Sequence, residues 1–166
     1  ASIACVAGQI GKPNSGLAPV RGQNNVQGSC DMGMLPNLYP GYQKVTDPAV
    51  RAKFAKAWGV PEEKLPLEEG YKLTDLGHLV DEGKVHCFYN YGEDPVQTEP
   101  DSAGMRKTLS ELDLFICQDI FMTQTTMLAD VILPATSWGE HECVFTASDR
   151  SFQHFDAAVP HKGECR

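Results

Sequence analysis

Several features that would assign a function directly are missing from this sequence. No stretch approaches the ~20 consecutive apolar residues of a membrane helix, so no membrane segment is expected. Basic residues are scarce, because 14 Lys and Arg stand against 22 Asp and Glu and the net charge is −8. Nucleic-acid phosphates are bound by basic surfaces, so this charge balance argues against nucleic acid as a partner.

Common binding motifs are absent as well. No C-x-x-C spacing occurs among the six cysteines, which argues against a zinc ribbon or an iron–sulfur ligand run within this chain. No G-x-G-x-x-G follows a predicted strand and no G-x-x-x-x-G-K-[ST] occurs, so ordinary nicotinamide dinucleotide and P-loop sites lack support. We expect the cysteines to be reduced and structural, with Cys87 and Cys117 buried because both lie in apolar runs.

The chain has the composition of a globular protein. Its 166 residues are 42% hydrophobic and 22% charged, which is enough to build a core. It starts at Ala1 within an apolar segment that has no signal-peptide pattern, and it stops at Arg166 after a polar run. A piece of a longer protein explains both ends best.

Three regions differ in composition. Residues 1–46 are rich in Gly and Pro, which predicts one long irregular loop. Residues 47–134 alternate helical and strand patterns and predict an α/β half-domain. Residues 135–166 alternate less clearly and predict the start of a neighbouring domain, in which VFTA and SFQHF are candidate short strands.

The middle region predicts a parallel sheet. A helix is expected over 48–58, with Asp47 as its cap and Gly59 as its stop, and another over 73–82. Apolar runs predict strands at 85–91, 114–117 and 131–133, separated by a helix starting near 102 and a short helix at 123–128. This alternation predicts part of a doubly wound, Rossmann-like α/β fold, and the continuous apolar strands predict a sheet covered on both faces.

Candidate ligand groups follow two of these strands. Gly92, Glu93 and Asp94 follow the first, and Gln118 and Asp119 follow the second. Ligands of open parallel sheets bind beyond the carboxyl ends of the strands, and a carboxylate suits a guanine edge or ribose hydroxyls. Position alone leaves open whether Asp94 and Asp119 bind a ligand or only cap helices.

A second polar cluster lies in the Gly-rich loop. Arg21 stands beside the amides of Gln23, Asn24, Asn25 and Gln27, and such a set suits a small oxyanion or a polar heterocycle. A hydrogen-bonded loop without a catalytic role explains the same residues. Two histidines near carboxylates, His141 and His154, have no recognisable ligand spacing and decide nothing.

Three segments carry a family resemblance. LAPVRGQNNVQGSCDMG (17–33), YNYGEDPVQT (89–98) and FICQDIFMTQTTMLADVILPATSWGEHECVFTASDR (115–150) resemble the catalytic large subunit of molybdenum- or tungsten-dependent formate dehydrogenases. YPGYQ (39–43) and FAKAWGV (54–60) extend the likeness. The combination in this order is highly specific, and RGQNNVQGSCDMG is typical of the formate dehydrogenases among enzymes with two molybdopterin guanine dinucleotides.

The resemblance implies roles for individual residues. Arg21 matches the active-site arginine near the metal, and Gln23 matches a residue that touches the pterin. The loops around one guanosine diphosphate arm are matched by Gly92, Glu93, Asp94, Gln118, Asp119 and Asp130.

The resemblance also implies cofactors and partners. The parent would use bis-(molybdopterin guanine dinucleotide) with Mo or W to oxidise formate, and a [4Fe–4S] cluster ligated outside this chain. Its partners would be the remaining domains of the subunit and electron-transfer subunits. We expect a cytoplasmic location, with a periplasmic parent as the alternative. A non-catalytic cofactor-binding module and a related enzyme such as a nitrate reductase are the alternative functions.

Overall fold

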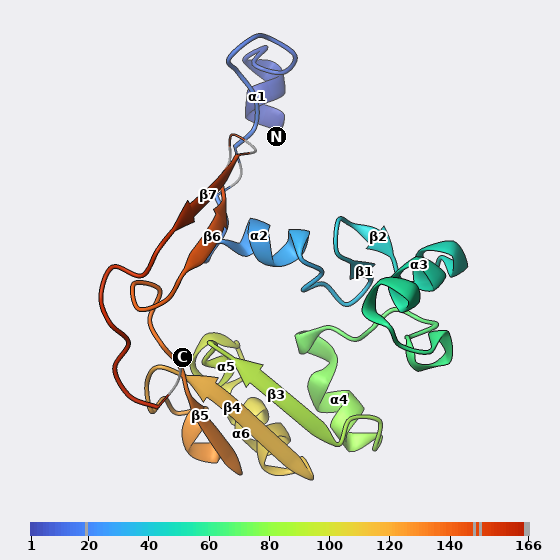
Figure 1. The fold of residues 1–166 in the computed structure, drawn as a ribbon, viewed down its shortest axis with the longest axis vertical. Helices are drawn as coiled ribbons and strands as arrows, with labels where there is room; N and C mark the ends of the chain where they lie inside the picture. Colours follow the sequence, from blue (N-terminus) through green and yellow to red (C-terminus); the bar gives the residue numbers. More distant parts are fainter. Residues whose placement is uncertain (19, 148, 150, 165–166) are drawn as a thin grey trace.

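A three-stranded parallel sheet forms the centre of the α/β part of the molecule (Figure 1). The computed structural model describes residues 1–18, 20–147, 149 and 151–164, so Cys165 lies outside the described residues. The strands are β3 (Cys87–Tyr91), β4 (Leu114–Asp119) and β5 (Val131–Pro134), and they lie side by side in chain order. The predicted parallel sheet is therefore confirmed.

Short helices connect these strands. Helices α5 (Pro95–Thr98) and α6 (Ser102–Ser110) join β3 to β4, and the 3₁₀ turn η3 (Thr126–Leu128) lies between β4 and β5. Asp101 caps α6 by accepting a hydrogen bond from the Gly104 backbone N at 2.9 Å, as its position before the helix predicts. The sequence pattern did not predict α5. Of the helices in the described ranges, none has both the length and the apolarity that crossing a membrane requires.

The main hydrophobic core lies between the sheet and this helix layer. Leu109 of α6 is 2% exposed, and Phe115 and Cys117 of β4 are 1% and 0% exposed. Leu76 of α4 (Leu76–Asp81) and Val96 of α5 complete the buried cluster. Removing these side chains from water is the largest stabilising contribution to this part of the chain.

The opposite face of the sheet is open. Along β3, Asn90 is buried towards the helices, whereas Tyr89 and Tyr91 are 52% and 62% exposed. Cys87 shares their face and is exposed, so the prediction that it is buried is wrong. The strands lie in the order β3, β4, β5, so each new strand is added on the same side of the previous one. Because parallel crossovers are right-handed, both connections then pack on the same face of the sheet. Within the described residues, the sheet is covered on one face only, contrary to the expectation from the apolar strands.

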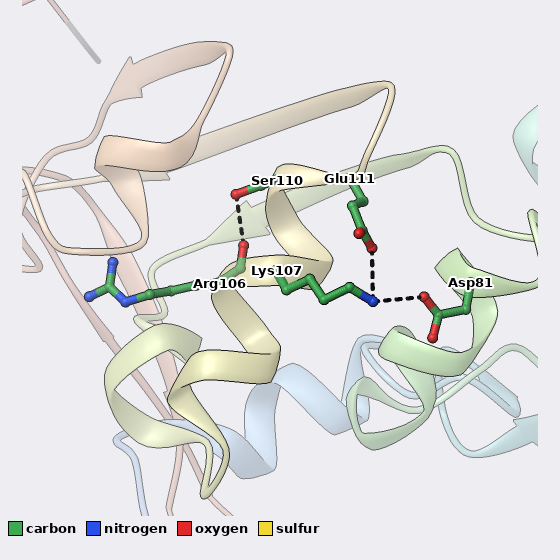
Figure 2. A network of polar contacts seen from close by, with 5 residues as sticks. All are labelled: Asp81, Arg106, Lys107, Ser110 and Glu111. Carbon is green, nitrogen blue, oxygen red and sulfur yellow. Dashed lines mark hydrogen bonds and ion pairs between the residues drawn. The ribbon is translucent and has the colours of Figure 1, made fainter.

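An exposed ion-pair network joins α6 to α4 on the outer side of the helix layer. Figure 2 shows Lys107 between Asp81 and Glu111, with Nζ–O distances of 3.4 and 3.5 Å. The hydrogen bond to Asp81, followed by the charges of Asp81 and Glu111, raises the pKa of Lys107. Exposed pairs of this kind contribute little to stability because water and salt screen them.

A second, smaller core lies beside helix α3 (Pro48–Trp58). Asp47 caps α3 through Ala49 N at 2.9 Å, and Gly59 ends it in the left-handed conformation at φ 66°, as predicted. The hairpin of β1 (Leu38–Tyr39) and β2 (Gln43–Lys44) packs on it, with the Tyr39 and Phe54 rings stacked at 4.8 Å. This small core therefore joins residues on both sides of position 46, where the sequence predicts a boundary between two regions.

The first 46 residues also contain helices. Helix α1 spans Ser2–Val6 and α2 spans Val26–Asp31. The prediction of one irregular loop over 1–46 is therefore wrong for these helices and for the hairpin. Asn25 precedes α2 at φ 58°, a conformation that asparagine tolerates better than most residues, so Gly and Pro content alone did not reveal this start.

A two-stranded antiparallel ribbon follows the parallel sheet. It consists of β6 (Cys143–Thr146) and β7 (Phe152–Phe155), which confirms the two candidate strands. Between β5 and β6, Glu140 accepts hydrogen bonds from Ser137 N at 2.8 Å and Lys162 N at 3.0 Å. These bonds, with the Ser137 bond the larger cause, lower the pKa of Glu140.

Truncating the core should cost far more stability than truncating the open face. We expect Leu109→Ala to lower the free energy of unfolding by about 2–5 kcal/mol, because it leaves a cavity beneath β4. Leu114→Ala is the matched control, since Leu114 is 37% exposed, and should cost less than about 1 kcal/mol. Urea denaturation followed by far-UV circular dichroism measures both. Equal losses of unfolding free energy in the two variants would contradict a core that lies on one face of the sheet only.

The turn held by Glu140 should loosen in acid. Because its folded pKa lies below the ordinary value of 4.5, the stabilisation is complete above that value and is lost as pH falls through the folded pKa. We expect the Trp138 fluorescence of a Trp58→Phe variant to change in this acidic range. Glu140→Gln should abolish the transition, whereas Glu142→Gln, in which His154 loses its partner instead, should keep it. A transition that survives in Glu140→Gln would refute the assignment.

Candidate functional site

The carboxyl ends of all three parallel strands meet at one edge of the sheet. Tyr91 at the end of β3 is in register with Gln118 of β4, and Gln118 is in register with Leu133 of β5. Beyond the strands, Gly92 N donates to Gln118 O at 2.9 Å and Ala135 N donates to Asp119 O at 3.0 Å. The prediction that the loops after β3 and β4 share one edge is confirmed.

A cavity of about 310 Å³ opens at this edge. Its walls are the end of β3 (Tyr91, Gly92), residues 118–121 from β4 onwards and residues 135–138 after β5. The rim is rich in exposed apolar side chains, because Phe121 is 71% and Trp138 is 69% exposed. An apolar rim around a few polar groups is typical of sites for planar organic ligands.

Asp119 supplies the carboxylate of this cavity. Its Oδ1 accepts a hydrogen bond from Phe121 N at 3.1 Å and so shapes the loop that forms the rim. Among the described residues, no hydrogen bond uses Oδ2 of Asp119. The neighbouring Gln118 accepts a hydrogen bond from the Tyr89 hydroxyl through Oε1, which fixes the orientation of its amide. One carboxylate oxygen and one amide N–H₂ therefore remain for a ligand.

Gly92 makes the turn that exposes the backbone of the cavity. It has φ 65°, which glycine adopts without strain, and a Cβ added there would meet no atom within 4 Å. A ligand can therefore approach the main chain closely at this point.

The Gly-rich loop reaches the same edge. Gln23 Nε2 donates to Glu93 Oε1 at 2.5 Å, although the two residues are 70 positions apart. Asn25 anchors the loop from the other side, since its Nδ2 donates to Val144 O and its Oδ1 accepts from Thr146 N, both at 3.0 Å. The structure thus brings together two predicted site residues from separate regions of the chain.

Arg21 extends from this loop with an exposed guanidinium group. Its Nη1 donates to the sulfur of Cys30 at 3.6 Å, and the Cys30 side chain is 6% exposed. Within the described ranges, none of the ion pairs involves Arg21. An unneutralised guanidinium with several remaining N–H donors is suited to a small anion.

Two of the predicted site aspartates, Asp94 and Asp130, accept hydrogen bonds from within the protein. Asp94 does not cap α5 with its side chain, because its Oδ1 accepts hydrogen bonds from Thr125. Asp130 lies at the opposite edge, where its Oδ2 accepts from Phe115 N at the start of β4, at 2.8 Å. The structure therefore does not bring Asp130 together with the other candidates, and its contact with a cofactor stays a prediction.

Several residues of the site were missed at the sequence level. Ile120 and Phe121 line the cavity beyond the end of β4, and both are exposed. An apolar run next to a polar Gln-Asp pair is the signal that could have identified them. Ser137 and Trp138, in the segment after β5, also line the cavity.

The histidines lie outside this cavity. His154 Nε2 lies 3.1 Å from Glu142 Oε1, and Asp156 completes a fully exposed group whose ligand atoms lie within 4.8 Å of one another. His141 Nδ1 shares a hydrogen bond with Thr136 Oγ1 at 3.0 Å, just behind the cavity wall. Neither arrangement contains a buried or preorganised ligand set.

Comparison with known proteins identifies relatives that are named formate dehydrogenases. Formate dehydrogenase H of Escherichia coli is 57% identical over 165 residues, which are 99% of this chain and 23% of that protein. The F420-dependent formate dehydrogenase 1 subunit alpha of Methanococcus maripaludis is 44% identical over 163 residues, 98% of this chain and 23% of the relative. A putative formate dehydrogenase of Bacillus subtilis, YrhE, is 39% identical over 165 residues, 99% and 16% of the two lengths.

This chain thus spans about a quarter or less of the length of these curated relatives. The family model described as "Molybdopterin oxidoreductase" matches residues 1–166. Since that match covers the whole chain, this protein belongs to the molybdopterin oxidoreductase family.

Proposed function

We propose that this chain is part of the catalytic subunit of an enzyme that oxidises formate to carbon dioxide. The proposal is supported by the 57% identity to formate dehydrogenase H and by the similar names of the other two relatives. These names favour formate over nitrate as the substrate, and an enzyme over a non-catalytic module. The remaining domains of the subunit and its electron-transfer subunits are the proposed partners.

The observation that carries the proposal is the meeting of two segments at one sheet edge. The Gln23–Glu93 hydrogen bond holds the Arg21 loop against the strand ends that form the cavity. A site for a large cofactor and a cation for a small anionic substrate therefore lie in neighbouring parts of one surface. This is the arrangement that a cofactor-dependent oxidation of formate needs.

The cavity suits one guanosine arm of a molybdopterin guanine dinucleotide. Asp119 Oδ2 can accept hydrogen bonds from a guanine edge, and the aromatic rim provides a surface on which the planar base stacks. Gly92 allows the diphosphate to approach backbone N–H groups, and Gln118 adds an amide donor. Gln23 and Glu93 border the path from the cavity to the Arg21 loop.

Arg21 is the proposed substrate-binding residue. Its planar guanidinium group pairs with both carboxylate oxygens of formate and orients the C–H bond. Oxidation releases carbon dioxide, one proton and two electrons, so the negative charge next to Arg21 disappears as the product forms. When bound, the molybdenum- or tungsten-containing bis-(molybdopterin guanine dinucleotide) supplies the acceptor for the two electrons. We further propose that the [4Fe–4S] cluster is ligated outside this chain, which has no C-x-x-C spacing.

Replacing Arg21 in the intact enzyme should slow turnover without removing the cofactor. Arg21→Lys keeps the charge but loses the bidentate fork, and Arg21→Ala loses both. We expect the rate to fall by roughly 10²–10³ in the alanine variant, because a charged hydrogen bond to the reacting group is lost. The measurements are formate-dependent dye reduction and the pterin and metal content of each variant.

Arg51→Lys is the control for this series, since Arg51 lies on α3 and pairs with Glu62 at 3.2 Å. It should leave turnover unchanged. Near-normal turnover in Arg21→Ala would exclude the catalytic role. Loss of cofactor together with activity would make Arg21 a structural residue of its loop.

Replacing Asp119 should act on cofactor retention instead. Asp119→Asn keeps the oxygen that accepts from Phe121 N, but its amide cannot accept a guanine N–H pair. We expect cofactor affinity to fall by about 1–3 kcal/mol, measured as guanosine monophosphate released on hydrolysis of the purified enzyme. Asp113→Asn is the matched control, because Asp113 is exposed before β4 and pairs with His86 at 2.9 Å. Equal retention in the two variants would contradict a guanosine site at Asp119.

A further inference from the structure

The loops after β3 and β4 are joined by one buried contact. Asp94 Oδ1 accepts hydrogen bonds from the Thr125 hydroxyl at 2.5 Å and from Thr125 N at 3.3 Å. The Thr125 hydroxyl in turn accepts a hydrogen bond from Val96 N at 3.0 Å. The chain of donors therefore runs from Val96 N–H through the threonine hydroxyl to the carboxylate.

This contact is shielded from water. Thr125 is 0% exposed and Val96 is 1% exposed, and Asp94 itself is partly buried. Hydrogen bonds to an ionised carboxylate are stronger than neutral ones, and burial reduces competition from water. Because the hydroxyl both donates and accepts here, replacing threonine by valine leaves the buried Val96 N–H without its partner and removes the shorter of the two hydrogen bonds to Asp94 Oδ1.

The two residues of this contact belong to loops that also supply cavity walls. Asp94 follows Gly92 by two positions, and Thr125 closes the loop that carries Ile120 and Phe121. Internal hydrogen bonds brace the second loop, such as the one from Thr126 N to Thr123 Oγ1 at 3.1 Å. Within the described residues, however, every hydrogen bond between segments 93–98 and 120–128 involves Thr125.

We propose that Asp94 and Thr125 form a latch that sets the width of the cavity, and that both are positioning residues for the cofactor. This proposal rests on the proposed function of the cavity and changes the role of Asp94. Oδ1 of Asp94 already binds two donors from Thr125, and Asp119 lines the cavity whereas Asp94 does not. In this proposal Asp94 therefore holds the opposite wall in place, and Asp119 contacts the ligand. Thr125 has no assignment from the sequence motifs.

The test uses the intact enzyme with its cofactor. Thr125→Val removes the hydroxyl at nearly constant shape, and Thr125→Ser keeps it. We expect the valine variant to lose its pterin cofactor roughly ten- to a hundred-fold faster on dilution, because a buried charge-assisted hydrogen bond is lost. The serine variant should return to within a few-fold of the parent rate. Thr108→Val on α6 is the control, because Thr108 is 8% exposed and its Oγ1 lies next to Gly77 of α4, and this variant should retain cofactor normally.

A double-mutant cycle separates the latch from a direct contact. If Asp94 acts only through Thr125, Asp94→Asn combined with Thr125→Val should release cofactor no faster than the more severe single variant. If the two substitutions instead multiplied each other's effect on the release rate, Asp94 would contact the ligand independently of Thr125, and the proposal would be overturned. Normal retention in Thr125→Val, or equal loss in Thr108→Val, would overturn it as well.

Measuring cofactor release tests the latch separately from formate oxidation. Cofactor release is followed by pterin fluorescence and needs no turnover, so a failure to oxidise formate would leave the latch result intact. In the loaded fraction, the KM for formate should not change in Thr125→Val, because the Gln23–Glu93 hydrogen bond that holds the Arg21 loop does not involve Thr125. A changed KM in the fully loaded enzyme would contradict a role confined to cofactor positioning.

Discussion

The parallel register of β3, β4 and β5 is the constraint on which the candidate site depends. Because the three strands run in one direction, their carboxyl ends place a glycine turn, an Asp-Gln pair and an aromatic segment at the same edge. If β4 shifted by one residue relative to β3 and β5, Gln118 would point towards the helix layer and Cys117 towards the open face. The buried Phe115 and Cys117 therefore hold the site in place as well as the core.

One-sided covering follows from the same topology. The strands are added in chain order, so each connection packs on the same face and the aromatic face of β3 stays exposed. In a doubly wound sheet, helices reach the second face only after the strand order reverses. A reversal is not part of the described chain, which corresponds to about a quarter or less of the length of its relatives.

Local signals predicted the sheet and part of the site. Asp47 and Gly59 delimit α3 through a cap and a left-handed turn, and both effects depend on neighbouring residues only. The strand ends at Gly92 and Asp119 followed from periodicity and the general position of ligands in parallel sheets. Cys87 was misassigned because an apolar run does not show which face of a strand will be covered. The partners of Glu93 and Asp94 could not be predicted, since they come from segments 70 and 31 positions away.

These long separations have a consequence for folding kinetics. The helices and strands between residues 76 and 134 contact close neighbours in the chain, so they close short loops and can form early. The hydrogen bonds of Asn25 to the ribbon close loops of 119 and 121 residues and carry a larger entropic cost. The loop that carries Arg21 is therefore expected to join the molecule last, after the sheet edge that lines the cavity has formed. A partly folded chain would then expose the cavity while Arg21 is still free to move.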